Sequence, residues 1–320
     1  MAGSSSWSRL HGCTAGSLLG NATRRVEDPA PSSALRPTGH PAYDRYAGQA
    51  AGSRSLPAMA RRVPEGPTPD PAVQKLRVRY AKRGRLRFSS TRDFQRALER
   101  ALRRADVPMA FSAGFHPHPK ISYANAAPTG TASESEYFEI SVTERVDPDA
   151  VRAALDDALP DGLDILQVVE AAPGALADRL QASDWVLAFR DVELGRLEEV
   201  AARFLAAERI EVTRTFKTGP RTFDVRAAVV ALEAARSDTV TGSVPQVVPA
   251  GTAGCAILRA VVRHTTPAVR PDDILTALRA VADLEPPTPP LVTRLAQGPL
   301  RDATARVADP LAADQRVDGS

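Results

Sequence analysis

Residues 75–105, KLRVRYAKRGRLRFSSTRDFQRALERALRRA, carry two hydrophobic periods in succession. Leu76, Val78 and Tyr80 alternate with basic residues, which predicts a half-buried strand. A serine or threonine within residues 89–91 then caps a helix, because apolar residues return every three or four positions after it. These apolar positions are Phe94, Ala97, Leu98, Ala101, Leu102 and Ala105. A strand followed by an amphipathic helix predicts an α+β protein.

Further strands and helices are expected after this stretch. Strands are predicted near residues 121–126, 137–142 and 163–169, and Asp147 is placed to cap a second helix. The order β-α-β-β-α-β is that of the ferredoxin-like split βαβ arrangement. A similar succession begins at residue 183 and includes a helix that starts at Pro271. We therefore predict tandem ferredoxin-like domains over residues 75–172 and 183–296.

The two ends of the chain have a different composition. Residues 1–74 contain 9 Pro, 8 Gly and 9 Ser, with little hydrophobic periodicity, and predict a disordered extension. An alternative is that Met59 is the true start. Residues 297–320 are predicted to form a mobile tail. No apolar run approaches the length needed to cross a bilayer, and no export signal is present, so we expect a cytoplasmic protein without a membrane partner.

The charge of the chain is unevenly distributed. Residues 75–120 contain 13 Lys and Arg against 3 Asp and Glu, and residues 121–170 contain 2 against 11, although the net charge is only +3. Two interpretations remain open. The basic and acidic blocks neutralise each other within one domain, or the basic residues share a face that meets a polyanion.

The second interpretation predicts a basic surface on the first strand, the following turn and the first helix. Arginines at steps of three and four residues share one face of that helix, and arginine suits phosphate because its planar donor group engages two oxygens. Phe111 is expected in the core, whereas Phe115 is expected to stack on bases. The residues assigned to RNA binding are Arg77, Arg79, Arg83, Arg85, Arg92, Arg96, Arg100, Arg103, Arg104, Phe115 and Lys120.

His116, His118 and Lys120 lie in a histidine–proline loop. Pro117 favours extended backbone, which would place both imidazoles on the same side. Three roles remain open: a rigid or substrate-contacting loop, general acid–base catalysis, or a metal site. The metal site would need further ligands, for which His264, Asp93 and Glu136 are the candidates.

Several segments resemble the radical-SAM-linked domain family of unknown function. They are FSSTRD (88–93), RALRRA (100–105), FSAGFHPHPKIS (111–122), PTG (128–130), SEY (135–137), FDVR (223–226) and VRPDD (269–273). The resemblance covers about residues 75–296, and Ser90 departs from it by standing where a histidine often precedes the helix. It implies a partner, or fusion partner, that is a radical-SAM protein with a cobalamin-type domain.

The cofactors implied by this resemblance belong to the partner. A radical-SAM cluster needs three closely spaced thiolates, and this chain has only Cys13 and Cys255. The iron–sulfur cluster, SAM and cobalamin are therefore expected on the other protein, with none in this chain. The leading hypothesis is an accessory protein that presents tRNA or rRNA for modification. The alternatives are a metal-independent RNA-processing nuclease that uses His116, His118 and Lys120, and a structural interaction module.

Overall fold

The fold is given by a computed structural model that describes residues 69–238 and 255–315. The first half contains β1 (Gln74–Lys82), η1 (Gly84–Phe88), α1 (Thr91–Arg104), β2 (Ile121–Ala124), β3 (Ala132–Val142), α2 (Pro148–Ala158), β4 (Ile165–Glu170) and α3 (Leu176–Arg179). The second half contains β5 (Ala182–Phe189), α4 (Leu194–Ala206), β6 (Glu211–Phe216), β7 (Gly219–Asp224), η2 (Arg226–Ala228), β8 (Val229–Arg236), β9 (Ala256–Arg263), α5 (Pro271–Ala282) and β10 (Leu291–Gly298). The chain continues into β11 (Leu300–Arg301), η3 (Asp302–Thr304) and β12 (Arg306–Val307). The alternative start at Met59 and most of the extension predicted for residues 1–74 lie outside the described residues.

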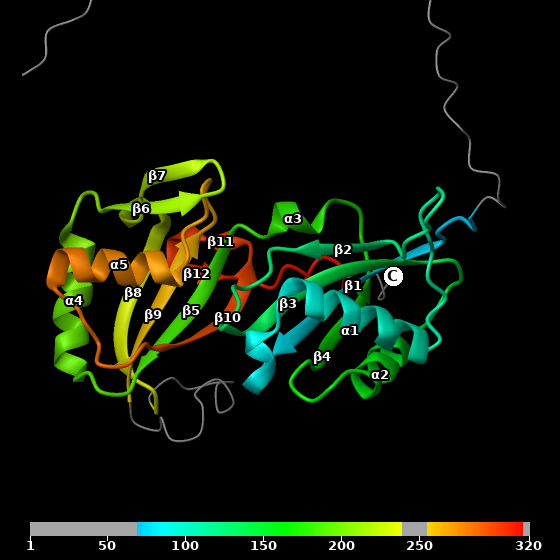
Figure 1. Cartoon of the computed structure of the whole chain (residues 1–320), viewed down its shortest axis with the longest axis horizontal. Helices are drawn as coiled ribbons and strands as arrows, with labels where there is room; N and C mark the ends of the chain where they lie inside the picture. Colours follow the sequence, from blue (N-terminus) through cyan, green and yellow to red (C-terminus); the bar gives the residue numbers. More distant parts are fainter. Residues whose placement is uncertain (1–68, 239–254, 316–320) are drawn as a thin grey trace, which may run out of the picture. The chain divides into compact units, whose positions relative to one another are not determined.

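A single mixed sheet of eight strands forms the centre of this α/β fold (Figure 1). Its order is β4-β1-β3-β10-β5-β9-β8, and β2 pairs with β3 off this path. The two halves meet where β10 lies parallel to β3, with Thr293 opposite Ala132 and Arg294 opposite Ser133. The segments predicted as two domains therefore share one sheet.

The start of α1 has the local structure that the sequence predicts. Ser90 Oγ accepts a hydrogen bond from the Asp93 backbone N–H at 3.2 Å, and the Asp93 carboxylate accepts one from the Ser90 N–H at 3.3 Å. This reciprocal pair satisfies donors that a helix start leaves without partners. Phe94 and Leu98, on the same helix, are buried. None of the helices in the described ranges is both long and apolar enough to cross a membrane.

Each half has a hydrophobic core between its strands and its helices. In the first half, Leu76 and Val78 of β1 pack with Phe94 and Leu98 of α1. In the second, α4 and α5 cover β8 and β9 (Figure 1), and Phe204 and Leu278 are fully buried there. Side chains on a strand alternate between faces, so β1 directs Arg77 away from the α1 core.

The C-terminal segment differs from the predicted mobile tail. Leu311 is fully buried against the face of the first half that α1 does not cover. Asp314 accepts hydrogen bonds from Arg77 at 2.6 Å and from Arg179 at 2.8 Å. The prediction was wrong for residues 297–315 because their polar composition conceals partners that lie far away in the sequence. Residues 316–320 lie outside the described part of the chain.

Candidate functional site

The basic residues of β1 do not form the exposed row that the sequence predicts. Arg77 is only 1% exposed, and its guanidinium binds Glu139 at 2.9 Å and Asp314 at 2.6 Å. Arg79 is half-buried and donates from Nε to the Glu134 carbonyl at 2.9 Å. Burial and pairing therefore remove both residues from a surface that would meet a polyanion.

The turn after β1 is neutralised in the same way. Arg83 forms ion pairs with Glu134 and Asp164, and the hydrogen bond to Glu134 raises the pKa of this guanidinium above its ordinary value. Lys82 is buried and donates to the Ala127 carbonyl at 3.3 Å, and desolvation lowers its pKa. For Arg83, the interpretation in which the acidic block neutralises the basic block is correct, whereas Lys82 is removed from the surface by burial and bonds to backbone carbonyls.

The arginines of α1 are different. Arg92, Arg96, Arg100 and Arg103, here called the α1 arginine row, are all exposed. None of the four side chains makes a hydrogen bond or ion pair with the described residues, and the same holds for the side chains of Arg85 and Lys120. Arg104 instead donates to the Ala158 carbonyl at 3.0 Å. Of the basic surface predicted for residues 75–120, the open part therefore lies mainly on α1, with Arg85 and Lys120 also exposed.

The histidine–proline loop projects side chains into solvent. Its backbone is closed by hydrogen bonds from the Ser112 N–H to the His118 carbonyl at 2.8 Å and from the His118 N–H to Ser112 Oγ at 3.0 Å. His116, His118 and Phe115 are exposed, Phe115 by 65%. Phe111 is 44% exposed, so the prediction that it belongs to the core was wrong.

The further metal ligands considered for this loop are engaged elsewhere. His264 bonds to Ser183, Asp93 caps α1, and Glu136 pairs with the buried Arg294. Within residues 69–238 and 255–315, no three His, Cys, Asp or Glu side chains are grouped so that they could hold a metal ion.

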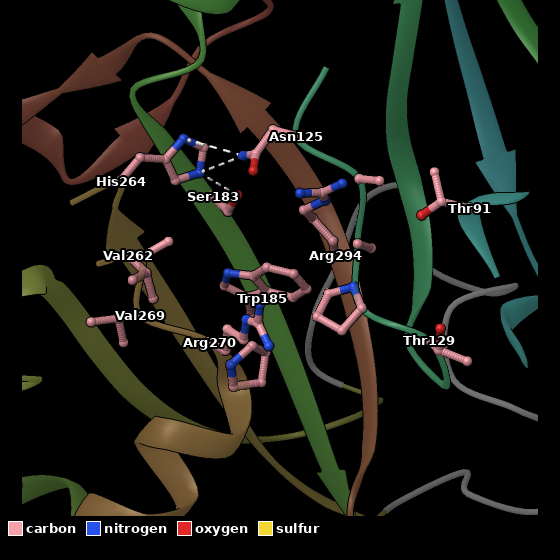
Figure 2. A pocket seen from close by; sticks show the side chains of 15 residues that line it. Thr91, Asn125, Thr129, Ser183, Trp185, Val262, His264, Val269, Arg270 and Arg294 are labelled. Carbon is pink, nitrogen blue, oxygen red and sulfur yellow. Dashed lines mark hydrogen bonds between the residues drawn. The ribbon is translucent and has the colours of Figure 1, made fainter. Parts of the chain in front are cut away.

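A cavity of about 360 Å³ lies where the two halves meet (Figure 2). It is bounded by the loop after β2, strands β5, β9 and β10, and the first residues of α1 and α5. Three of the segments that carry the family resemblance contribute to it, through Thr91, Thr129 and Arg270. The histidine–proline loop does not line it. Residues as far apart in the sequence as Thr91 and Arg294, 203 positions, thus meet at this cavity.

One wall of the cavity is a hydrogen-bonded chain centred on His264 (Figure 2). Nδ1 of His264 lies 2.7 Å from the Leu180 carbonyl, and Nε2 lies 2.8 Å from Ser183 Oγ. Because a carbonyl only accepts, Nδ1 carries the proton and Nε2 accepts from the Ser183 hydroxyl. Asn125 Nδ2 lies 3.3 Å from Nε2 and donates to Gln297 Oε1 at 3.0 Å. Burial lowers the pKa of His264, which favours the neutral ring.

The cavity lining also includes one member of a buried ion pair, Arg294. Arg294 is 2% exposed, pairs with Glu136, and places its guanidinium carbon 5.3 Å from the centre of the Trp185 ring. Sequence reasoning did not assign Arg294, Ser183, Trp185 or Asn125 to a site. The sequence feature that could have pointed to them is the presence of a few polar residues inside or beside apolar, strand-forming runs. The sequence analysis considered only the charges of the first half and did not examine these residues.

The lowered pKa of His264 predicts a loss of stability at mildly acidic pH. The unfolded chain binds this proton near the ordinary pKa of 6.5, whereas the folded chain binds it only at lower pH. The contribution of His264 to the free energy of unfolding should therefore stay constant above pH 6.5 and decrease as the pH falls below 6.5. Urea denaturation between pH 5 and pH 7.5 measures this, and His264→Gln should flatten the fall. A matched variant in the exposed loop, His118→Gln, should retain it, and an equal slope in His264→Gln and wild type would contradict the prediction.

Comparison with known proteins identifies the family. The family described as "Uncharacterized protein conserved in bacteria (DUF2344)" matches residues 75–271, which is more than half of the chain. A search of curated proteins gave no match. The matched range begins in β1 and reaches the first residue of α5, so it contains the α1 arginine row, the histidine–proline loop and most of the cavity lining. The chain therefore belongs to the DUF2344 family.

Proposed function

We propose that the protein binds single-stranded RNA along α1 and acts as an accessory protein in RNA modification. The observation that carries this proposal is the contrast within the basic segment. Arg77 and Arg83 are held by carboxylates, whereas the four arginines of the α1 arginine row are exposed without such partners among the described residues. Arginine is well suited to bind phosphate oxygens in pairs.

The geometry of α1 suits an extended strand. From Arg92 to Arg103 the helix rises by about 16 Å, at about 1.5 Å per residue. The chain that follows α1 leads to the exposed Phe111 and Phe115. Proteins that bind single-stranded nucleic acid combine a basic path for the backbone with aromatic rings on which bases stack. The arginines and the two phenylalanines supply both features.

The strand orders support the predicted fold assignment. The strand order β4-β1-β3-β2 is antiparallel at every pairing, and β10-β5-β9-β8 has the same pattern in the second half. These orders support tandem ferredoxin-like modules joined in one sheet, with the β6–β7 hairpin as an insertion. RNA-recognition domains of this topology stack bases on their four-stranded sheet, so the proposal of binding along α1 rests on the α1 arginine row and not on the topology.

A radical-SAM protein remains the proposed partner. Support comes from the segments that resemble the radical-SAM-linked family. A cluster needs three thiolates and this chain has two cysteines, so the proposal places the cluster on the partner. In this proposal the partner carries the iron–sulfur cluster, SAM and cobalamin, and this chain supplies the RNA. Co-purification from the native cell, followed by iron analysis, tests it, and recovery without a cluster-bearing protein would contradict it.

Loss of two charges from α1 is expected to weaken RNA binding. Arg96→Ala/Arg100→Ala should reduce the affinity for a single-stranded RNA of about 12 nucleotides by 10-fold or more, because charged hydrogen bonds to phosphate are lost. The slope of log K against log salt should fall by about 1.4, at about 0.7 for each lost phosphate contact. Fluorescence anisotropy at several salt concentrations measures both quantities.

A matched control removes two exposed helical arginines from the second half. Arg203→Ala/Arg279→Ala makes the same change in net charge, on α4 and α5. It should leave affinity and salt slope near wild-type values. Equal losses in both double variants would reduce the proposal to non-specific attraction. Cleavage of the RNA by wild type, lost in His118→Ala, would instead favour the nuclease.

A further inference from the structure

We propose that the cavity between the two halves holds one unstacked nucleotide of the RNA that lies along α1. This inference rests on the proposed function and deepens it, because it names the site at which a single base would be held apart from its neighbours. The observations that carry it are the size of the cavity, the surfaces that line it, and its position at the start of the α1 arginine row.

The size of the cavity suits one small planar ligand. Ligand pockets have volumes of about 300–1,000 Å³, and this cavity, at about 360 Å³, lies at the lower end. A folded RNA element would not enter it. A single base with its sugar is of the right order, and a base must leave its stack to be held in such a pocket.

The lining offers an aromatic–guanidinium pair and several hydrogen-bonding groups. Bases stack on aromatic rings or on guanidinium planes. Trp185 and Arg294 line the cavity (Figure 2), but they are only 5% and 2% exposed and the guanidinium lies over the ring, so a base would meet the exposed edge of this pair. Hydrogen-bonding groups also remain available. Asn125 Oδ1 and the hydroxyls of Thr91 and Thr129 make no hydrogen bond to the described residues. These groups can distinguish the edge of a base.

The cation available to a phosphate is Arg270. Its side chain is exposed, points toward Trp185 from the start of α5 (Figure 2), and makes no hydrogen bond or ion pair within the described ranges. Arg294 is already neutralised by Glu136. The helix starts themselves are occupied, because Asp93 caps α1 and Asp273 accepts the Arg270 backbone N–H at 2.8 Å. The guanidinium of Arg270, not a helix N-terminus, is therefore the phosphate contact.

The position of the cavity connects it to the proposed RNA path. Thr91 lines the cavity, and Arg92, the next residue, begins the α1 arginine row. A strand whose phosphates follow this row reaches the mouth of the cavity at its Arg92 end. At the other end of α1 the chain leads to the histidine–proline loop with Phe115. The RNA would thus be held by stacking at one end and by insertion of a nucleotide at the other.

The experiment uses Trp185 as the reporter. Trp7→Phe leaves Trp185 as the one tryptophan of the full-length chain. A single-stranded 12-nucleotide RNA should quench its fluorescence. A set of RNAs, each abasic at one position, should include one that binds about 5- to 100-fold more weakly, since stacking of one base contributes that much, and that no longer quenches. Arg270→Ala, at an exposed position that should not affect folding, should reduce affinity and quenching together, whereas Arg279→Ala on the same helix should change neither.

The possible results separate this inference from the proposed function. Salt-dependent binding that needs Arg96 and Arg100, but leaves Trp185 unquenched and tolerates every abasic position, would overturn the inference alone. No RNA binding at all would overturn both. Free adenosine and uridine monophosphates form a further arm. Quenching by these at millimolar concentration and none by RNA would show a site for free nucleotides and overturn the RNA-linked inference. Quenching by RNA at far lower concentration supports it.

Discussion

Arg294→Ala is expected to lower the free energy of unfolding by about 3–5 kcal/mol, because it leaves the buried Glu136 carboxylate without its partner. Both side chains of this pair are 2% exposed. The remaining contacts of Glu136 are limited. Its second carboxylate oxygen accepts the Ala127 N–H at 3.0 Å, and the nearby charge of Lys82 belongs to an ammonium whose pKa is itself lowered by burial. Urea denaturation of wild type and variant measures the loss.

The double variant Arg294→Met/Glu136→Gln separates charge from packing. Removal of both charges leaves no uncompensated ion, so the double variant should recover most of the lost stability. The glutamine oxygen can still accept the Ala127 N–H. If the double variant were as unstable as Arg294→Ala, packing beside Trp185, not the ion pair, would account for the effect. If Arg294→Ala were within 1 kcal/mol of wild type, the junction of β3 and β10 would not depend on this pair.

Local elements were predictable because their signals lie within a few residues. The alternation of Leu76 and Val78 with basic residues identified β1, and the apolar positions of α1 identified the helix, with its cap within residues 89–91, where the structure has Ser90. Strands β8 and β10 were not predicted. The sequences VVALEAAR and LVTRLAQG have no clear period of two, and these segments become strands because neighbouring strands supply their hydrogen bonds.

Of the candidate site, only the α1 arginine row could be predicted from the sequence, because its residues share one face of a single helix. The spacing of the arginines of α1 was sufficient to place them together. The same argument failed for Arg77, because its partner Asp314 lies 237 residues away and is visible only in the folded chain. The cavity could not be predicted from the sequence for a related reason. Ser183 lies on β5, Arg294 on β10 and His264 directly after β9, and the order of these strands in the sheet, with β10 between β3 and β5, differs from their order in the sequence.

Asp314→Ala tests the largest correction to the sequence-based prediction, the docking of the C-terminal segment. The Asp314 carboxylate is fully buried and accepts hydrogen bonds from Arg77, Arg179 and the Ala172 N–H. Its removal leaves Arg77 with excess buried positive charge, since Glu139 also pairs with Lys75. We expect a loss of about 3–5 kcal/mol in the free energy of unfolding, measured by urea denaturation.

The matched control for Asp314→Ala is Asp302→Ala, in the same segment. Asp302 pairs with Arg263 on the surface, where both side chains are largely exposed, and such pairs contribute at most about 1 kcal/mol. A similar small loss in Asp314→Ala would mean that the segment is not docked in solution. RNA affinity gives an independent check. Because successive side chains of β1 point to opposite faces, Asp314 and Arg77 lie behind the strand and α1 in front of it. Below its melting temperature, Asp314→Ala should therefore bind RNA with wild-type affinity. This result would separate the stabilisation of the sheet from RNA binding by the α1 arginine row.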